Sequence, residues 1–148
     1  MKKKIDVLKD IISAWCERQD IDAVLSHLSE DVEWHFAAVS APPVFGHAGA
    51  RKFLEDYGSR VKNPKWRVFS YAENDNALFV EGVDEFELQR GGRTIVPYMG
   101  VLEFDGDKVI GWRDYFDRGA ADSSAKGEPL PDHVEKLTAR RALPGLGG

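Results

Sequence analysis

The chain has 148 residues, of which 43% are hydrophobic and 11% aromatic, and it carries a formal net charge of −5. This length suits one globular domain with a sizeable core, and the acidic balance argues against a nucleic-acid surface because Lys and Arg are spread along the chain. No run approaches the roughly 18 apolar residues of a membrane span, so we expect no membrane partner and a cytoplasmic location.

Three helices are predicted in the first half of the chain. Apolar residues recur with helical spacing over residues 4–18, which predicts an amphipathic helix. Asp20 follows as a candidate N-cap of a second helix, so that these two helices form a hairpin. The same spacing predicts a third helix over residues 48–61.

Strand periodicity dominates the second half. Residues 65–71, 77–88, 94–104 and 108–116 are predicted to form four strands, separated by turn sequences rich in Asn, Asp and Gly. A shorter strand is expected earlier, over residues 31–36. Helices first and a meander last are typical of an α+β fold, with the helices packed over the inner face of a curved antiparallel or mixed sheet.

Residues 119–148 differ from the rest in composition. We expect a loop over residues 120–127, a short helix over residues 132–141 and a frayed end from residue 143 onward. The folded domain then spans residues 1–118, and the remainder either caps its open end or is mobile.

Period-two alternation places two carboxylates on the inner face of the sheet. Asp84 shares its face with Leu78 and Val80, and Asp114 shares its face with Ile110. Burying a lone carboxylate is costly unless it is paired, hydrogen-bonded or protonated, so such positions indicate function. The alternative for each acid is a structural carboxylate satisfied by backbone amides or by an arginine.

Turn positions give a predicted register. If the two hairpins fold about Gly91 and Gly106, then Asp84, Tyr98 and Asp114 lie in one row across the sheet. Two carboxyl groups in an apolar pocket push their pKa values apart, so one can act as a general acid and the other as a general base. The Tyr98 hydroxyl can then donate to a developing oxyanion or position a water molecule.

A second predicted row suggests where a ligand fits. Gly82, Gly100 and Trp112 lie next to the acids, and the two missing side chains leave room for a ligand. The predicted walls of the substrate-binding pocket are Trp34, Phe36, Phe86, Val96, Trp112 and Phe116.

The run Gly111-Trp112-Arg113-Asp114-Tyr115-Phe116-Asp117, with Val83-Asp84 upstream and Gly100-Val101-Leu102-Glu103-Phe104 between, resembles the limonene-1,2-epoxide hydrolase family. That family lies within the NTF2-like group, which also holds ketosteroid isomerase and the SnoaL-like polyketide cyclases. The resemblance covers roughly residues 5–118 and implies a cone-shaped α+β barrel that opens epoxides in one step, without metal, cofactor or covalent intermediate. It also implies that Asp114 is the base that activates water and that Asp84 is the acid.

Other positions depart from the family's pattern. The arginine that bridges the two acids falls on Gly82, and the Tyr and Asn that help to hold the water fall on Trp34 and Phe36. Tyr98 is a candidate replacement hydroxyl, whereas Arg113 is predicted to face outward. His35 lies on the outer parity of its strand, unless a bulge turns it inward.

Three functions therefore stay open, and each takes a small apolar molecule. They are epoxide hydrolysis, a SnoaL-like or ketosteroid-isomerase-like proton transfer beside a carbonyl, and non-catalytic binding of a hydrophobic ligand. No cofactor or metal is expected, since Cys16 is the only cysteine and no Cys/His spacing suggests zinc. A homodimer through the outer sheet face is expected because four apolar residues there need cover, namely Phe79, Val83, Met99 and Val101.

Overall fold

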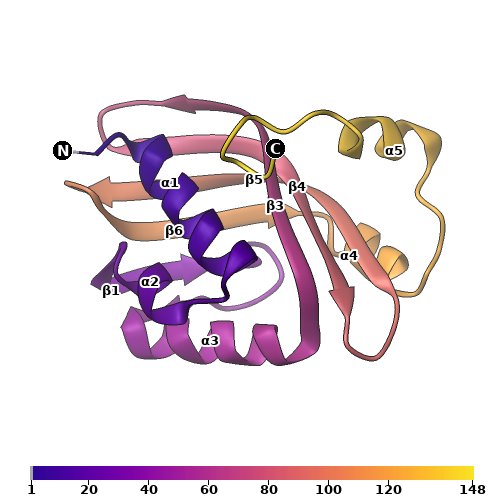
Figure 1. Ribbon diagram of the computed structural model, residues 1–148, viewed down its shortest axis with the longest axis horizontal. Helices are drawn as coiled ribbons and strands as arrows, with labels where there is room; N and C mark the ends of the chain where they lie inside the picture. Colours follow the sequence, from indigo (N-terminus) through magenta and orange to yellow (C-terminus); the bar gives the residue numbers. More distant parts are fainter. Residues whose placement is uncertain (1) are drawn as a thin grey trace.

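The computed structural model describes residues 2–148, and within that range a six-stranded mixed sheet organises the fold (Figure 1). The strand order is β2-β1-β6-β5-β4-β3, and all neighbours are antiparallel except β1 and β6. The strands are β1 (Leu28–His35), β2 (Val44–Phe45), β3 (Val61–Glu73), β4 (Ala77–Leu88), β5 (Arg93–Asp105) and β6 (Lys108–Phe116). The helices are α1 (Lys4–Ile12), continued by the π-helical turn η1 (Ser13–Glu17), then α2 (Ile21–Leu25), α3 (Gly46–Arg60), α4 (Arg118–Ala125) and α5 (Asp132–Thr138).

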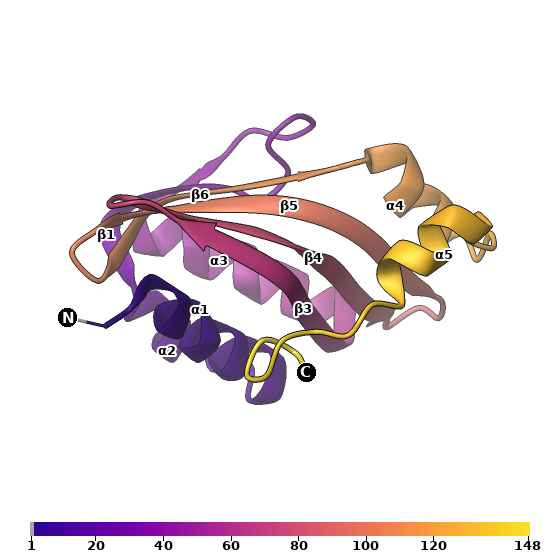
Figure 2. The same ribbon diagram turned by 90° about the horizontal axis from the view of Figure 1, so that it is seen from above.

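The N-terminal helices cover the inner face of the sheet, as predicted. Figure 2 shows α1, α2 and α3 on the same side of the curved strands. Ile11 of α1 and Leu54 of α3 are fully buried there, and each such side chain stabilises the fold by roughly 1.5–3 kcal/mol. The Asp20 side chain accepts a hydrogen bond from the Ala23 amide, which confirms the predicted N-cap of α2. No helix within residues 2–148 is long and apolar enough to cross a membrane.

The first large hairpin, β4 with β5, pairs two residues away from the predicted register. Asp84 lies opposite Val96 rather than Tyr98. The hairpin is centred on Arg90, one residue before the predicted Gly91. Gly91 and Gly92, which both have positive φ, form the second half of the turn. Because the shift is even, the side chains predicted to face inward still do so.

The second hairpin, β5 with β6, is also shifted by two residues, so that Asp114 lies opposite Gly100. The two-residue turn Gly106–Asp107 displaces the register by one residue, and a bulge at Ile110 displaces it by another. The bulge also turns Ile110 outward, where it is 41% exposed, and buries Val109 instead. The inward position predicted for Ile110 is therefore wrong.

Neither predicted row of site residues forms. Asp84, Tyr98 and Asp114 occupy three successive rows of the inner face, and Trp112 lies opposite Leu102 instead of beside the glycines. Strand alternation predicted the face of the sheet that each of these site residues occupies. The turn positions did not predict which residues lie opposite one another on neighbouring strands.

Helix α4 occupies the segment where a loop was predicted. It begins after Asp117, whose side chain accepts a hydrogen bond from the Ala120 amide at 3.0 Å. Strand β6 ends at Phe116, so β5 extends beyond its neighbour and needs another partner. Ser124 of α4 supplies one, because its Oγ accepts the hydrogen bond of the Ile95 amide at 2.9 Å.

The end of the chain packs against β3 instead of fraying. The Leu143 amide donates to the Val68 carbonyl, and the Val68 amide donates to the Leu146 carbonyl, both at 2.9 Å. Leu146 is only 1% exposed and belongs to the core beneath α1. The last residues thus cover part of the edge strand β3.

The C-terminal segment also covers part of the outer sheet face. Glu85 is 6% exposed and forms ion pairs with Arg67 and Arg93. Arg140 holds Glu81 with two hydrogen bonds of 3.0 and 3.1 Å. These charges are therefore paired beneath the segment that follows α4.

Candidate active site

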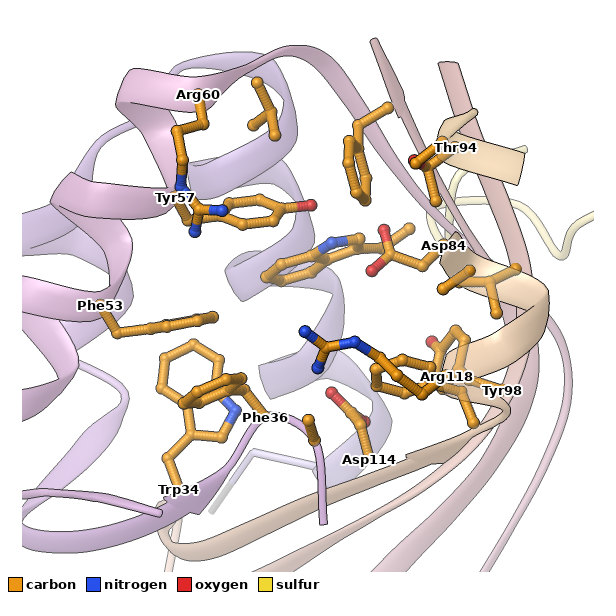
Figure 3. A pocket seen from close by; sticks show the side chains of 18 of the residues that line it. Trp34, Phe36, Phe53, Tyr57, Arg60, Asp84, Thr94, Tyr98, Asp114 and Arg118 are labelled. Carbon is orange, nitrogen blue, oxygen red and sulfur yellow. The ribbon is translucent and has the colours of Figure 1, made fainter. Parts of the chain in front are cut away.

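A cavity of about 450 Å³ lies between α3, the inner face of the sheet and α4 (Figure 3). The nine residues predicted to form the site all line it, namely Trp34, Phe36, Asp84, Phe86, Val96, Tyr98, Trp112, Asp114 and Phe116. The volume is in the usual range of small-molecule sites, and the lining is mostly apolar. The cavity therefore suits a small apolar molecule that meets two carboxyl groups.

Stacked aromatic rings form one wall. Trp34 stacks on Trp112 with ring centroids 4.6 Å apart, and Phe36 stacks on Phe53 with centroids 4.4 Å apart. Such pairs stabilise the packing by roughly 0.5–1.5 kcal/mol beyond the burial of their area. Trp34 and Phe36, which stand where the resembled family has its water-holding Tyr and Asn, are thus wall residues.

Asp84 and Asp114 both point into the cavity (Figure 3). No ion pair involves either carboxylate among residues 2–148, and Asp84 Oδ1 is buried without a hydrogen-bond partner there. Burial raises the pKa of Asp84 to about 7. Burial, together with the charge of Asp84, raises the pKa of Asp114 to about 8. Near neutral pH the two acids therefore hold about one proton between them.

Two glycines provide the space for Tyr98 and Asp114. A Cβ on Gly100 would lie 2.6 Å from Asp114 Oδ1, and a Cβ on Gly82 would lie 3.2 Å from Tyr98 Cε1. The Gly82 position is also closed by the Arg67 carbonyl oxygen, 2.2 Å from such a Cβ. No side chain fits at Gly82, so a bridging arginine is sterically excluded at this position. Burial, and then the nearby acids, raises the pKa of the Tyr98 phenol.

Tyr57 of α3 is a lining residue that the sequence did not reveal. Its hydroxyl is buried without a hydrogen-bond partner among residues 2–148 and points toward the centre of the cavity (Figure 3). Burial is the main cause that raises the pKa of this phenol, and the charge of Asp84 adds to it. In the sequence Tyr57 belongs to the apolar stripe of the helix, and that periodicity gives no sign that it borders a cavity.

Three arginines at the rim were also missed. Arg60 ends α3, Arg90 lies in the turn between β4 and β5, and Arg118 begins α4, yet all three line the cavity. Residues so far apart in the chain show no shared motif, and only the tertiary fold brings them together. Arg93, the other arginine of this hairpin, instead pairs with Glu85 on the outer face.

Two other residues that the sequence singled out lie outside the cavity. Arg113 faces outward, as predicted, and pairs with Glu103. His35 also stays on the outer side of β1, where its Nε2 lies 2.8 Å from Glu33 Oε1. Within residues 2–148, no three His, Cys, Asp or Glu side chains gather as a metal site would require.

Comparison with known proteins identifies the fold. The model of the SnoaL-like domain family matches residues 9–112. No curated protein matches the chain at a significant level. An NTF2-like protein of unknown function from Burkholderia pseudomallei is 17% identical with a TM-score of 0.74, the match covering 84% of this chain and 98% of that one.

Two further solved structures have names that suggest reactions. An LEH-like epoxide hydrolase from M. tuberculosis is 20% identical, with a TM-score of 0.73 and coverage of 90% of this chain and 94% of that one. A putative polyketide cyclase from Pseudomonas putida is 14% identical, with a TM-score of 0.74 and coverage of 84% and 99%. At these identities the similarity shows the fold alone, and it confirms the predicted NTF2-like architecture.

Proposed function

The chain belongs to the SnoaL-like domain family, and from that premise we propose that it is an enzyme that transfers protons to and from a small apolar molecule without a cofactor. The observation that carries the proposal is the pair of acids in the cavity. Asp84 and Asp114 face one apolar space, form no ion pair with any residue from 2 to 148 and hold about one proton near neutral pH. An ionised and a protonated carboxyl group at the same substrate supply a general base and a general acid together.

Epoxide hydrolysis is the reaction we propose first. Because the pKa of Asp114 is raised further than that of Asp84, the reactive form of the pair is the less populated one, in which the shared proton lies on Asp84. In this form ionised Asp114 takes a proton from water while the water oxygen attacks an epoxide carbon. The carbon–oxygen bond breaks, and the oxygen takes the proton of Asp84. A vicinal diol leaves, and the proton on Asp114 returns to Asp84. The positions of both acids resemble those of the limonene-1,2-epoxide hydrolase family, and one structural neighbour is named an LEH-like epoxide hydrolase.

A second reaction, proton transfer beside a carbonyl, is favoured by one observation. The cavity lacks the two water-holding residues of the resembled family, since Trp34 and Phe36 stack with other rings. It has instead two phenols, Tyr57 and Tyr98, beside the acid pair. A protonated acid and a phenol can stabilise an enolate oxygen while the other acid moves the proton.

The deciding experiment is product analysis with a panel of small cyclic and terpene epoxides in oxygen-18 water. We expect wild type to form a diol with one oxygen from solvent. Asp114→Asn and Asp84→Asn should each reduce the rate by a factor of about 100 or more, because each removes a proton-transfer group. Asp75→Asn is the matched control, since this exposed carboxylate lies in the turn between β3 and β4.

The other outcomes assign the other functions. If no diol forms above the level of the Asp114→Asn variant, the hydrolase proposal fails. Exchange of deuterium from D₂O beside the carbonyl of cyclic enones, lost in the same variants, would then establish the isomerase-type reaction. If both activities are absent, ligand binding remains, and the two variants should keep or gain affinity because each removes a buried acid. The cytoplasmic location remains a prediction from the sequence.

A further inference from the structure

Charged residues form the rim of the cavity, and they indicate a property of the ligand that the acid pair does not indicate. Of the residues that line the cavity, four are exposed, and these are Arg60, Arg90, Arg118 and Asp122. Exposed lining residues mark where the cavity meets solvent. The mouth is therefore formed by three guanidinium groups and one carboxylate.

The rim arginines are largely free to bind a ligand. Arg118 Nε lies 3.5 Å from Asp122 Oδ1, a loose contact between two side chains that are 58% and 62% exposed. Within residues 2–148, no ion pair involves Arg60 or Arg90. Arg60 and Arg118 extend toward the cavity from opposite sides in Figure 3. The mouth thus has a net positive charge of two.

The cavity is therefore electrostatically polarised along its length. Its inner wall carries Asp84 and Asp114, which repel an anion once either is ionised. Its middle is aromatic and aliphatic, and its mouth is cationic. An amphiphilic molecule with one anionic end would lie with its apolar body against the aromatic rings and its charge at the arginines.

We propose that the ligand of this cavity is a small apolar acid, with a carboxylate held by Arg60 and Arg118 at the mouth. The planar guanidinium group donates two parallel hydrogen bonds to a carboxylate, and it also packs against apolar surface, so it suits this position better than lysine would. In this orientation the end of the molecule remote from the carboxylate meets the acid pair. The inference rests on the proposed function in naming the substrate class, and its test needs only binding.

The test compares ligands that differ only in charge. Three pairs serve as probes, namely 4-tert-butylbenzoate, cyclohexylacetate and 1-adamantanecarboxylate, each with its primary amide. Binding is followed by tryptophan fluorescence, because Trp34, Trp66 and Trp112 line the cavity, and by calorimetry. We expect at least one carboxylate to bind about tenfold or more tightly than its amide in about 0.02 M salt, and this preference to shrink in about 0.5 M salt.

Variants locate the source of the preference. Arg60→Gln and Arg118→Gln should each reduce carboxylate affinity and leave amide affinity unchanged, and the double variant should bind both members of a pair equally. Arg141→Gln removes the same charge from an exposed residue outside the cavity and should behave as wild type. Thermal unfolding of each variant verifies that the fold is retained.

Three results would overturn the inference. They are equal affinity for carboxylates and amides in wild type, no binding of any carboxylate in the panel, and a preference that survives in the double variant. All binding measurements are repeated in Asp114→Asn, which retains the rim arginines. Product formation tests the proposed catalysis and ligand binding tests this inference, so either can fail without the other.

Discussion

The two inner acids, Asp84 and Asp114, differ from an ion-paired buried carboxylate in their protonation. Glu85, on the outer face, is buried between Arg67 and Arg93 and stays ionised, since these arginines lower its pKa against the effect of burial. Asp84 and Asp114 pair with no cation in the described part of the chain, residues 2–148, and burial raises their pKa values. The fold thus leaves the inner pair with protons to exchange, which is what acid–base chemistry requires.

This difference predicts how stability depends on pH. The pKa values of Asp84 and Asp114 rise from the ordinary aspartate range, about 3.9 in an unfolded chain, to about 7 and about 8. Between about pH 4 and pH 8 the folded state holds protons that the unfolded chain has released, so these groups lower stability as the pH rises. We expect Asp114→Asn to reduce that slope and to raise the free energy of unfolding at pH 8 by about 1–3 kcal/mol. Urea denaturation at a series of pH values measures both quantities.

Asp75→Asn is the control for this prediction, because its carboxylate is exposed in both states and should leave the slope as in wild type. If Asp114→Asn leaves the pH dependence of the free energy of unfolding unchanged, Asp114 is ionised in the folded state at little cost in free energy. The two acids would then not share a proton near neutral pH.

At the level of single residues, the sequence predicted one side of the cavity and not the other. Strand parity alone placed Asp84, Tyr98 and Asp114 on the inner face, because a period of two admits only two faces. Tyr57 and Arg60 come from a helix, where a stripe of apolar residues identifies the buried side without separating core from cavity. The residues from α3 therefore had no signal in the sequence that pointed to the site.

At the level of elements, the strands were predicted well and their register was not. Register depends on local features of the backbone, here the positive φ of Gly91 and Gly92 in one turn and the bulge at Ile110 within β6. Helix α4 was missed because its Ala- and Ser-rich sequence has little apolar periodicity. Asp117 was a usable signal, since an aspartate at this position caps the first turn.

Helix α4 makes a testable contribution as the partner of the free edge of β5. Ser124→Ala removes the Oγ that accepts the Ile95 amide hydrogen bond, and a buried donor without a partner costs about 1–3 kcal/mol. We expect the free energy of unfolding to fall by that amount and the Ile95 amide to exchange faster with D₂O. Ser123→Ala, one residue earlier on the same helix, should leave Ile95 protected. Unchanged exchange at Ile95 in the Ser124 variant would show that α4 does not hold this edge.

At the level of the whole molecule, the outer sheet face is divided into a covered part and a bare part. Val83 is fully buried and Val101 is 8% exposed, so these two residues, which we expected to need cover from a second chain, are already covered. Phe79, Met99 and Tyr115 remain 44%, 56% and 46% exposed. Met99 pairs directly with Tyr115 across the sheet, and Phe79 lies on the neighbouring strand, so the three form one apolar patch.

We propose that a second copy of the chain covers this patch, because an apolar sheet face of this kind favours self-association through its own two-fold partner. Met99→Glu places a charge at the most exposed of the three positions and should convert a dimer to a monomer in sedimentation velocity. Val39→Glu is the control, since Val39 is 77% exposed in the loop between β1 and β2 and is not one of the three patch residues. Because the patch lies on the face of the sheet opposite the cavity, Met99→Glu should leave ligand affinity unchanged. A wild-type chain that sediments as a monomer at all concentrations, or a Met99→Glu variant that remains a dimer, would show that this face is not the interface.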